Sequence, residues 1–383
     1  MSDSPLVIFG CGYVGTRLAR AALATGRPVR ACARGVARLE PLRELGAEVV
    51  FIDAARPKQF GPALVGTMGA TVVYSVPPPA DVPAGESVRR ATQAALSHGA
   101  RAFIYLGTSG LYGVRRDDDW VDEDTNIALD DGAMAPRISD ESAVQAAAAA
   151  GLRTCVLRLA AIYGPGRGVR QRLRKGDYKL IDGGEHFISR IHVDDLVQVI
   201  LAAEEKAPPG ALYLVGDDHP TPQKEVALWL CARLGFPPPP SQPVWGQGAG
   251  RTVQRGRRLR NDRMKRELGV TLRYPSYLEG EAAIEAEEAG LSTPPPPVAS
   301  VAPAAAAEPP AATVEAPAVP RWHEVWTDAS GARLVLLRAL SDDALEAIDS
   351  RGAAPSARFA SYDEARATLG RDLRRVEGRW PTT

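Results

Sequence analysis

A short apolar strand that runs into three closely spaced glycines is the feature that most constrains the fold of this chain. Residues 6–9, Leu-Val-Ile-Phe, are predicted to form a buried parallel strand, and the glycine-rich run Gly-Cys-Gly-Tyr-Val-Gly follows at 10–15. The segment 16–25 then has a helical pattern that Gly26 ends. A strand, a Gly-x-Gly-x-x-Gly turn and a helix in this order are typical of a dinucleotide-binding unit.

Each glycine of this loop has its own physical task. Gly10 permits the tight turn, Gly12 leaves no side chain between the backbone and a pyrophosphate, and Gly15 lets helix and strand pack closely. The helix N-terminus adds free N–H groups and the positive end of its dipole. We therefore expect the loop, including Tyr13 and Val14, to bind a dinucleotide. The alternative is a turn that needs glycines without any ligand.

The end of the second predicted strand indicates which dinucleotide is bound. The strand at 28–33 is followed by Arg34, with Arg38 one helical turn onward, and no acid occupies this position. An NAD-preferring site usually has an acid about 20 residues after the loop, for the ribose 2′-hydroxyl. A guanidinium instead suits a 2′-phosphate. We expect NADP as the preferred cofactor and NAD as the alternative, unless Arg34 is simply a solvated loop residue.

Strands and helices alternate along the first half of the chain. Further strands are predicted at residues 47–52, 71–76, 102–106 and 154–157, and a helix at 86–97. This alternation predicts an α/β fold, a doubly wound parallel sheet of the Rossmann type with helices on both faces. Because ligands of such sheets lie beyond the carboxyl ends of the strands, Asp53, Ser75 and Thr108 are expected around one site.

The composition argues against polyanionic partners. A chain of 383 residues exceeds one core, so two or more domains are expected. The 46 basic and 46 acidic residues balance, which argues against a nucleic-acid or membrane-surface binder. No apolar stretch is long enough to span a membrane, no signal peptide is visible, and the four cysteines lack metal-ligand spacing. We expect a cytoplasmic protein that binds a small-molecule substrate and no metal.

Four segments together resemble the extended (atypical) short-chain dehydrogenase/reductase family, of the NAD-dependent epimerase/dehydratase type. They are the glycine loop and residues 105–113, 157–166 and 190–196, and the resemblance covers residues 5–288. It implies a domain at 1–290 with a small substrate-side subdomain, formed by about 165–190 and 210–285. It also implies NAD(P)-dependent chemistry.

The resemblance assigns roles to single residues. Asp53 matches an acid that bonds the adenine amino group, and Ser75 and Val76 match positions that touch the cofactor ribose. Thr108 matches the active-site Ser/Thr that hydrogen-bonds a substrate hydroxyl or carbonyl. The alternatives are a turn cap for Asp53 and an ordinary strand-end hydroxyl for Thr108.

The proton relay of this family is absent from the sequence. The relay is a Tyr-x-x-x-Lys pair, in which the ammonium lowers the phenol pKa so that tyrosinate can take an alcohol proton. The corresponding helix contains neither Tyr nor Lys, and Pro136 and Asp140 occupy the pair's positions. Asp140 or Glu141 could act as the base if burial raised its pKa. Alternatively, both acids only favour the dipole of the first helical turn.

Two classes of function follow from these observations. The first is an NAD(P)-dependent oxidoreductase or epimerase/dehydratase-like enzyme with a rebuilt relay, acting on a small carbonyl or hydroxyl compound or a nucleotide sugar. The second is a catalytically silent NADP-binding sensor or scaffold protein. The glycine loop supports both equally. We favour the enzyme by analogy with the fold.

The composition changes after residue 290. Residues 291–320 are almost entirely Pro, Ala, Val, Ser and Thr, which predicts a disordered linker. Residues 321–383 are predicted to form a small α+β module, with a hairpin at 322–340 and helices capped by Ser341 and Ser361. A module of about 60 residues has a marginal core. We therefore expect it to dock on a protein partner or on the first domain.

Overall fold

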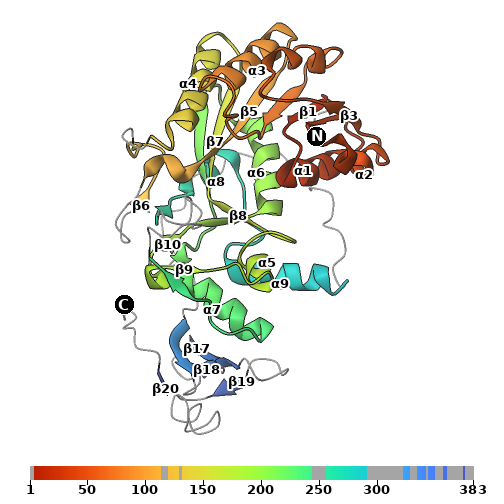
Figure 1. The fold of residues 1–383 in the computed structure, drawn as a ribbon. Helices are drawn as coiled ribbons and strands as arrows, with labels where there is room; N and C mark the ends of the chain where they lie inside the picture. Colours follow the sequence, from red (N-terminus) through yellow and green to blue (C-terminus); the bar gives the residue numbers. More distant parts are fainter. Residues whose placement is uncertain are drawn as a thin grey trace, which may run out of the picture. The chain divides into compact units, whose positions relative to one another are not determined.

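The computed structural model is built on a seven-stranded sheet in which every strand pair is parallel (Figure 1). The structure describes residues 4–113, 120–128, 132–243 and 256–290, and the backbone of five strands between 322 and 375. The strand order is β12-β7-β5-β4-β1-β2-β3. This order confirms the predicted doubly wound α/β fold.

The strands of this sheet are short apolar runs. They are β1 (Leu6–Phe9), β2 (Val29–Ala33), β3 (Glu48–Phe51), β4 (Thr71–Tyr74), β5 (Ala102–Thr108), β7 (Thr154–Leu159) and β12 (Ala211–Val215). Six of them were expected from the sequence. The edge strand β12, which pairs with β7, was not.

Helices cover both faces of the sheet (Figure 1). Helices α1 (Tyr13–Leu23) and α6 (Val193–Lys206) contribute Leu18 and Val197 to the core on one face. Helices α3 (Glu86–Ser97) and α4 (Ala135–Ala149) contribute Val88 and Val144 to the core on the other. Burial on both faces explains why the strands are continuous apolar runs. Within the described ranges, no helix has the length and apolar character needed to cross a membrane.

The chain divides into two compact units. The first comprises Met1–Gly166, His186–Thr221 and Gly250–Ser300, and contains the parallel sheet. The second comprises Arg167–Glu185, Pro222–Ala249 and Val301–Thr383. Within the second unit, α5 (Val169–Arg174) packs on α7 (Gln223–Leu234) around Tyr178 and Ala227. The further helices of the first unit include α2 (Glu40–Arg43), α8 (Asp262–Leu268) and α9 (Tyr277–Glu288).

Near the C-terminus, the structure has an antiparallel sheet of order β19-β18-β17-β16-β20, in which β19 is Ala357–Phe359 and β20 is Arg374–Arg375. The predicted hairpin is present as β16 (Trp322–Thr327) and β17 (Leu334–Ser341). The predicted helix after Ser341 is wrong, because β18 (Ala344–Asp349) pairs with β17 instead. Backbone pairing with a neighbouring strand here overrides the local capping signal. The predicted linker and the predicted helix from Ser361 lie outside the described residues.

A buried ion pair connects α6 to the amino end of the sheet. Arg27 donates to both carboxylate oxygens of Glu204, at 2.7 and 2.6 Å. Thr71 and Arg101 also donate to Glu204 Oε1, at 2.8 and 2.7 Å. The Arg27 and Glu204 side chains are 7% and 3% exposed. Removing one partner of such a pair costs about 3–5 kcal/mol, so this cluster strongly couples the helix to the strands.

Candidate functional site

The glycine loop lies at the carboxyl end of β1 and packs against the end of β4. Gly10 has a φ of +87°, in the left-handed region that favours glycine. A Cβ on Gly10 would lie 2.8 Å from Val76 Cγ2 and 2.9 Å from the carbonyl carbon of Ser75. Only glycine fits at this position. The predicted cofactor residues Ser75 and Val76 therefore adjoin the loop directly.

Gly12 has an open environment instead. A Cβ on Gly12 would have Gly10 O, at 3.8 Å, as its nearest neighbour. Helix α1 begins at the next residue, Tyr13, without a side-chain cap from Gly12. The first N–H groups of a helix lack intrahelical partners. Open space beside such a helix terminus fits the pyrophosphate of a dinucleotide.

Two further residues of the loop fix its packing. A Cβ on Gly15 would lie 3.0 Å from Ile8 Cγ2, so this glycine allows α1 to approach β1 closely. The hydroxyl of Tyr13 donates to the carbonyl oxygen of Pro165 at 3.1 Å. Val14, between them, is buried. The loop is thus attached to the segment after β8 (Ala161–Tyr163).

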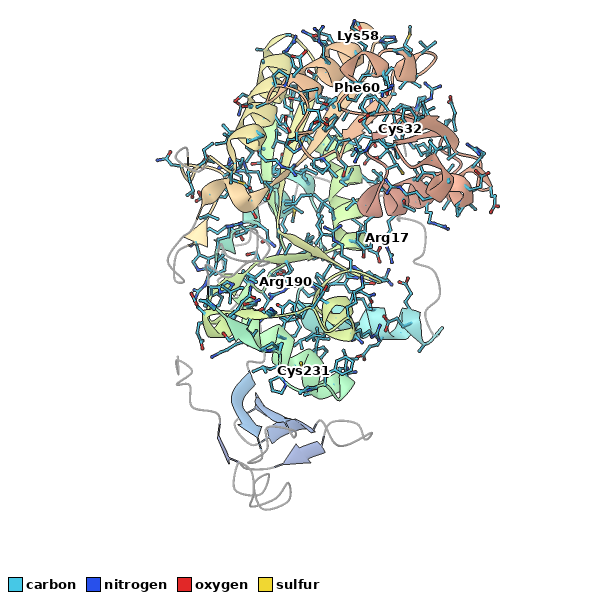
Figure 2. The ribbon with its side chains drawn as sticks, in the orientation of Figure 1. Arg17, Cys32, Lys58, Phe60, Arg190 and Cys231 are labelled. Atoms are coloured by element: carbon cyan, nitrogen blue, oxygen red, sulfur yellow. The ribbon has the colours of Figure 1, made fainter. Side chains whose placement is uncertain are left out.

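Helix α1 is also held by an ion pair. Arg17, labelled in Figure 2, donates to Asp194 of α6 at 2.7 Å. The Arg17 and Asp194 side chains are 23% and 19% exposed, so water screens the pair only in part. This contact joins the helix that follows the glycine loop to the predicted segment at 190–196, which contains Asp194.

Two arginines follow the carboxyl end of β2 and are exposed. These are Arg34 and Arg38. Burial raises the pKa of the Cys11 thiol to about 11, and the positive charge of Arg38 acts against that rise. A guanidinium therefore lies near enough to the glycine loop to act on it electrostatically.

Asp53 forms a turn after β3. Its Oδ1 accepts a hydrogen bond from the Ala55 N–H at 3.1 Å, and its own N–H donates to Gln59 Oε1 at 2.8 Å. Its Oδ2 lies 4.0 Å from Arg56 Nε. The turn-cap alternative is therefore present in the structure. The role of Asp53 toward adenine stays a prediction.

Thr108 ends β5 and is half-buried. Its Oγ1 accepts a hydrogen bond from the Gly110 N–H at 3.0 Å and caps the 3-10 helix η4 (Ser109–Tyr112). A hydroxyl that accepts this bond keeps its proton to donate to another acceptor. The geometry thus suits a hydroxyl that donates to a substrate oxygen.

Helix α4 places two acids against the sheet. Asp140 is 1% exposed, Tyr105 donates to its Oδ2 at 3.0 Å, and burial raises the pKa of this carboxyl to about 6. Arg158 donates to Glu141 Oε2 through Nε and Nη2, at 3.1 and 2.9 Å. Arg158 also donates to the Tyr112 hydroxyl at 2.7 Å. Both acids are therefore bonded to side chains of the sheet, Asp140 to Tyr105 of β5 and Glu141 to Arg158 of β7.

Arg257 contacts the segment that follows β5, although no sequence motif pointed to this residue. Arg257 is 4% exposed and donates to Ser109 Oγ at 3.3 Å. The two residues are 148 positions apart, so sequence proximity does not indicate the contact. The arginine-rich run at 255–260 was the available signal.

Comparison with known proteins identifies the family. Residues 6–216 match the model of the NAD dependent epimerase/dehydratase family. The chain belongs to this family. The predicted resemblance is thereby confirmed, and an NAD(P) nucleotide is the cofactor typical of its members.

Individual relatives of this family member extend the comparison. A conserved protein of unknown function from Silicibacter pomeroyi is 33% identical, with 74% of this chain and 99% of that chain covered and a TM-score of 0.64. A UDP-glucose 4-epimerase from Thermotoga maritima, solved with UDP-glucose, is 19% identical, with coverages of 76% and 100% and a TM-score of 0.60. At that identity, the second likeness concerns the fold alone.

A curated relative from a Streptomyces species is named 3-diazoavenalumate denitrifying reductase. It is 33% identical over 147 residues, which make up 35% of this chain and 47% of the relative. The chain thus matches about half the length of this relative.

The different environments of Gly10 and Gly12 predict different effects when each is replaced by alanine. Gly12→Ala should leave the free energy of unfolding within about 1 kcal/mol, because its Cβ meets open space. It should lower NAD(P)H affinity at least about tenfold, because the methyl group blocks the pyrophosphate. Gly10→Ala should destabilise the fold by at least about 1–3 kcal/mol through its positive φ and its contact with Val76. Urea unfolding measures the stability of each variant, and calorimetric titration measures its affinity for NADPH. The assignment would be contradicted if both variants lost the same affinity and had the same stability.

The raised pKa of Asp140 predicts a pH-dependent gain in stability for Asp140→Asn. A carboxyl with a raised folded-state pKa destabilises the folded protein increasingly as the pH rises from about 4 to about 6, and fully above that. The variant should therefore match the unmodified protein near pH 4 and exceed it at pH 7, by on the order of 3 kcal/mol at most. Urea unfolding across this range tests this, with Asp81→Asn at an exposed position as the control. A variant less stable at pH 7 would contradict it.

Proposed function

We propose that this family member is an NADP-dependent oxidoreductase that reduces a small acceptor without a Tyr–Lys proton relay. The observation that carries the proposal is the hydroxyl of Thr108, which the Gly110 N–H orients at the end of β5. The open environment of Gly12 leaves room for a cofactor. Helix α4, Ala-Pro-Arg-Ile-Ser-Asp-Glu-Ser-Ala-Val-Gln followed by four alanines, contains neither Tyr nor Lys.

The missing relay leaves the proton transfer of the redox reaction to another group or to water. Oxidising an alcohol requires a base that takes the hydroxyl proton as hydride leaves. Asp140 and Glu141 are engaged by Tyr105 and Arg158, which argues against either as a freely approaching base. In the reduction, water would supply the product's proton, and in the reverse reaction it would take that proton, because both directions share one transition state. We take reduction as the direction because the Streptomyces relative is named a reductase.

Thr108 is the residue we assign to polarising the acceptor. A bound reduced nicotinamide would supply hydride, and negative charge would then develop on the acceptor atom. A hydroxyl already oriented by the Gly110 N–H can donate to that atom without reorganising. A small carbonyl compound is the acceptor class we favour, with a nucleotide sugar as the alternative.

The name of the Streptomyces relative supports the direction of the reaction. We extend from that name only the word reductase, because the match covers 35% of this chain. The alternative function, a catalytically silent NADP-binding sensor or scaffold, is favoured by the same missing relay. Cofactor turnover distinguishes the two.

The cofactor preference rests on Arg34, with Arg38 beside the glycine loop. Arg34→Asp should lower NADPH affinity at least about tenfold more than NADH affinity, because a carboxylate repels a 2′-phosphate and can bond a 2′-hydroxyl. Calorimetric titration of both cofactors gives the ratio. An exposed arginine elsewhere, changed as Arg20→Asp, serves as the control. An unchanged ratio in Arg34→Asp would remove this residue from the cofactor site.

The proposed reduction is tested by NADPH oxidation with a panel of carbonyl compounds and nucleotide sugars. Where turnover is found, Thr108→Ala should lower kcat about tenfold or more, and Thr108→Ser should restore most of it, since it keeps the hydroxyl. An unaffected kcat in Thr108→Ala would return Thr108 to a capping role. Tight NADPH binding without turnover would favour the sensor or scaffold. Binding of neither cofactor would contradict both functions.

A further inference from the structure

We propose that the thioether of Met134 is an apolar contact for the acceptor beside Thr108, so that the acceptor is an aromatic carbonyl compound. The inference rests on the proposed function, because that function makes the Thr108 hydroxyl the group that binds the acceptor oxygen. It goes further by naming a residue that selects the acceptor and by favouring an aryl aldehyde or ketone over a nucleotide sugar.

Met134 lies next to the hydroxyl assigned to the acceptor. It is the residue from which α4 begins, and the N–H groups of Arg137 and Ile138 donate to its carbonyl oxygen at 2.9 and 3.0 Å. Met134 Sδ and Thr108 Oγ1 would each lie 3.2 Å from a Cβ on Gly110. The sulfur and the hydroxyl therefore flank the same backbone position. An acceptor oxygen bound to Thr108 would bring its substituents close to the thioether.

Both side chains remain partly accessible. Thr108 and Met134 are half-buried, whereas the neighbouring Ser109, Leu111 and Tyr112 are buried. The buried residues fix the segment that follows β5, and the two half-buried side chains contribute to its surface. A site that selects a ligand requires this combination of a fixed backbone and accessible side chains.

The first turn of α4 adds a second apolar residue. Pro136, at the predicted position of the relay tyrosine, follows Met134 by two residues and is half-buried. Its side chain has no hydrogen-bonding group, whereas a phenol would bond a polar ligand. The beginning of α4 therefore carries apolar groups where the family has a polar one.

The chemistry of these side chains favours an aromatic ring. A thioether is apolar and polarisable, and it makes favourable contacts with aromatic rings. Sugar hydroxyls placed against it would lose their water without gaining a comparable hydrogen bond, which weakens binding. In an aryl aldehyde or ketone, the ring is joined directly to the carbonyl carbon. The oxygen could then accept from Thr108 while the ring lies against Met134.

The first test compares the binding of two amides that NADPH does not reduce. Benzamide and glycolamide carry a phenyl ring and a hydroxymethyl group beside the same carbonyl, and both are titrated calorimetrically into the NADPH-loaded protein. We expect benzamide to bind about tenfold or more tightly, because its ring buries apolar surface. Met134→Gln should reduce this preference to about threefold or less, because it places a polar amide in the contact. Met134→Leu should keep most of it, since leucine is apolar and of similar volume.

Met68→Gln is the matched control. It makes the same substitution at a methionine that is 83% exposed. The preference for benzamide should remain intact in this variant.

Methyl NMR locates the ring in the unmodified protein. The chain has four methionines, so labelling their methyl groups with ¹³C gives few signals, and Met134→Leu identifies the signal of Met134. Benzamide should shift this signal through the ring current of its phenyl group and leave the Met68 signal in place. This measurement does not depend on the folding of Met134→Gln.

Several results would overturn the proposal. They are equal binding of the two amides to the unmodified protein, a preference that survives Met134→Gln, and an equal loss in Met68→Gln. A Met134 methyl signal that benzamide does not shift, or tighter binding of UDP-glucose than of benzamide, would also overturn it.

NADPH oxidation separates this site from the proposed function. Each turnover with benzaldehyde would form one benzyl alcohol, with hydride from NADPH and a proton from water. A Met134-dependent preference for benzamide without NADPH oxidation by benzaldehyde would contradict the proposed reduction and uphold the site. NADPH oxidation by glycolaldehyde, without a preference for benzamide, would do the reverse.

Discussion

The direct contact between Gly10 and the end of β4 is the constraint on which the rest of the site depends. Strands β1 and β4 are paired up to Phe9 and Tyr74, so the residues that follow them meet. A side chain on Gly10 would collide with Ser75 and Val76. With glycine there, the chain turns tightly and α1 starts where its N-terminus faces open space beside Gly12. The position of the proposed cofactor site thus follows from the close approach of Gly10 to the end of β4.

The segment where the family normally keeps its proton relay has become a set of packing contacts in this chain. Tyr105 with Asp140, and Arg158 with Glu141, connect α4 to the sheet through buried hydrogen bonds. Burial raises the pKa of Asp140 to about 6, which is the expected result of desolvating a carboxyl. In this chain the helix contributes chiefly to the hydrogen-bonded interior, and our proposal assigns the chemistry to the strand end at Thr108.

Much of the fold and part of the site could be predicted from the sequence. The strand ends at Phe9 and Ala33 follow from short apolar runs bounded by glycine or arginine signals, which are local. The strand β4 ends at Tyr74, two residues before the predicted end at Val76. The edge strand Ala211–Val215 was missed, because its partner β7 is remote in sequence and only pairing defines it. The N-cap signal at Ser341 misled for the same reason, since β17 supplies a backbone partner that local capping cannot anticipate.

The site shows the same division. The glycine loop and Thr108 could be placed from motifs, because each is defined by neighbours a few residues away. The contact between Ser109 and Arg257 could not, because it joins segments 148 residues apart. Whether Asp140 is buried depends on how α4 meets Tyr105, which composition alone does not determine. Local motifs could therefore be predicted from the sequence, whereas contacts between segments that are distant in sequence could not.

The cluster around Glu204 has a consequence for how the chain is made. Its carboxylate lies 177 residues after Arg27, and at 5–20 residues per second a ribosome needs roughly 10–35 s to cover that distance. Until Glu204 is made, Arg27 lacks its acceptor, as do Thr71 and Arg101 once they are made, and β7 lacks its outer neighbour β12 until shortly afterwards. The nascent sheet therefore has an open edge and uncompensated charge until its last strand emerges. We expect the growing chain to be most vulnerable to mispairing in that period.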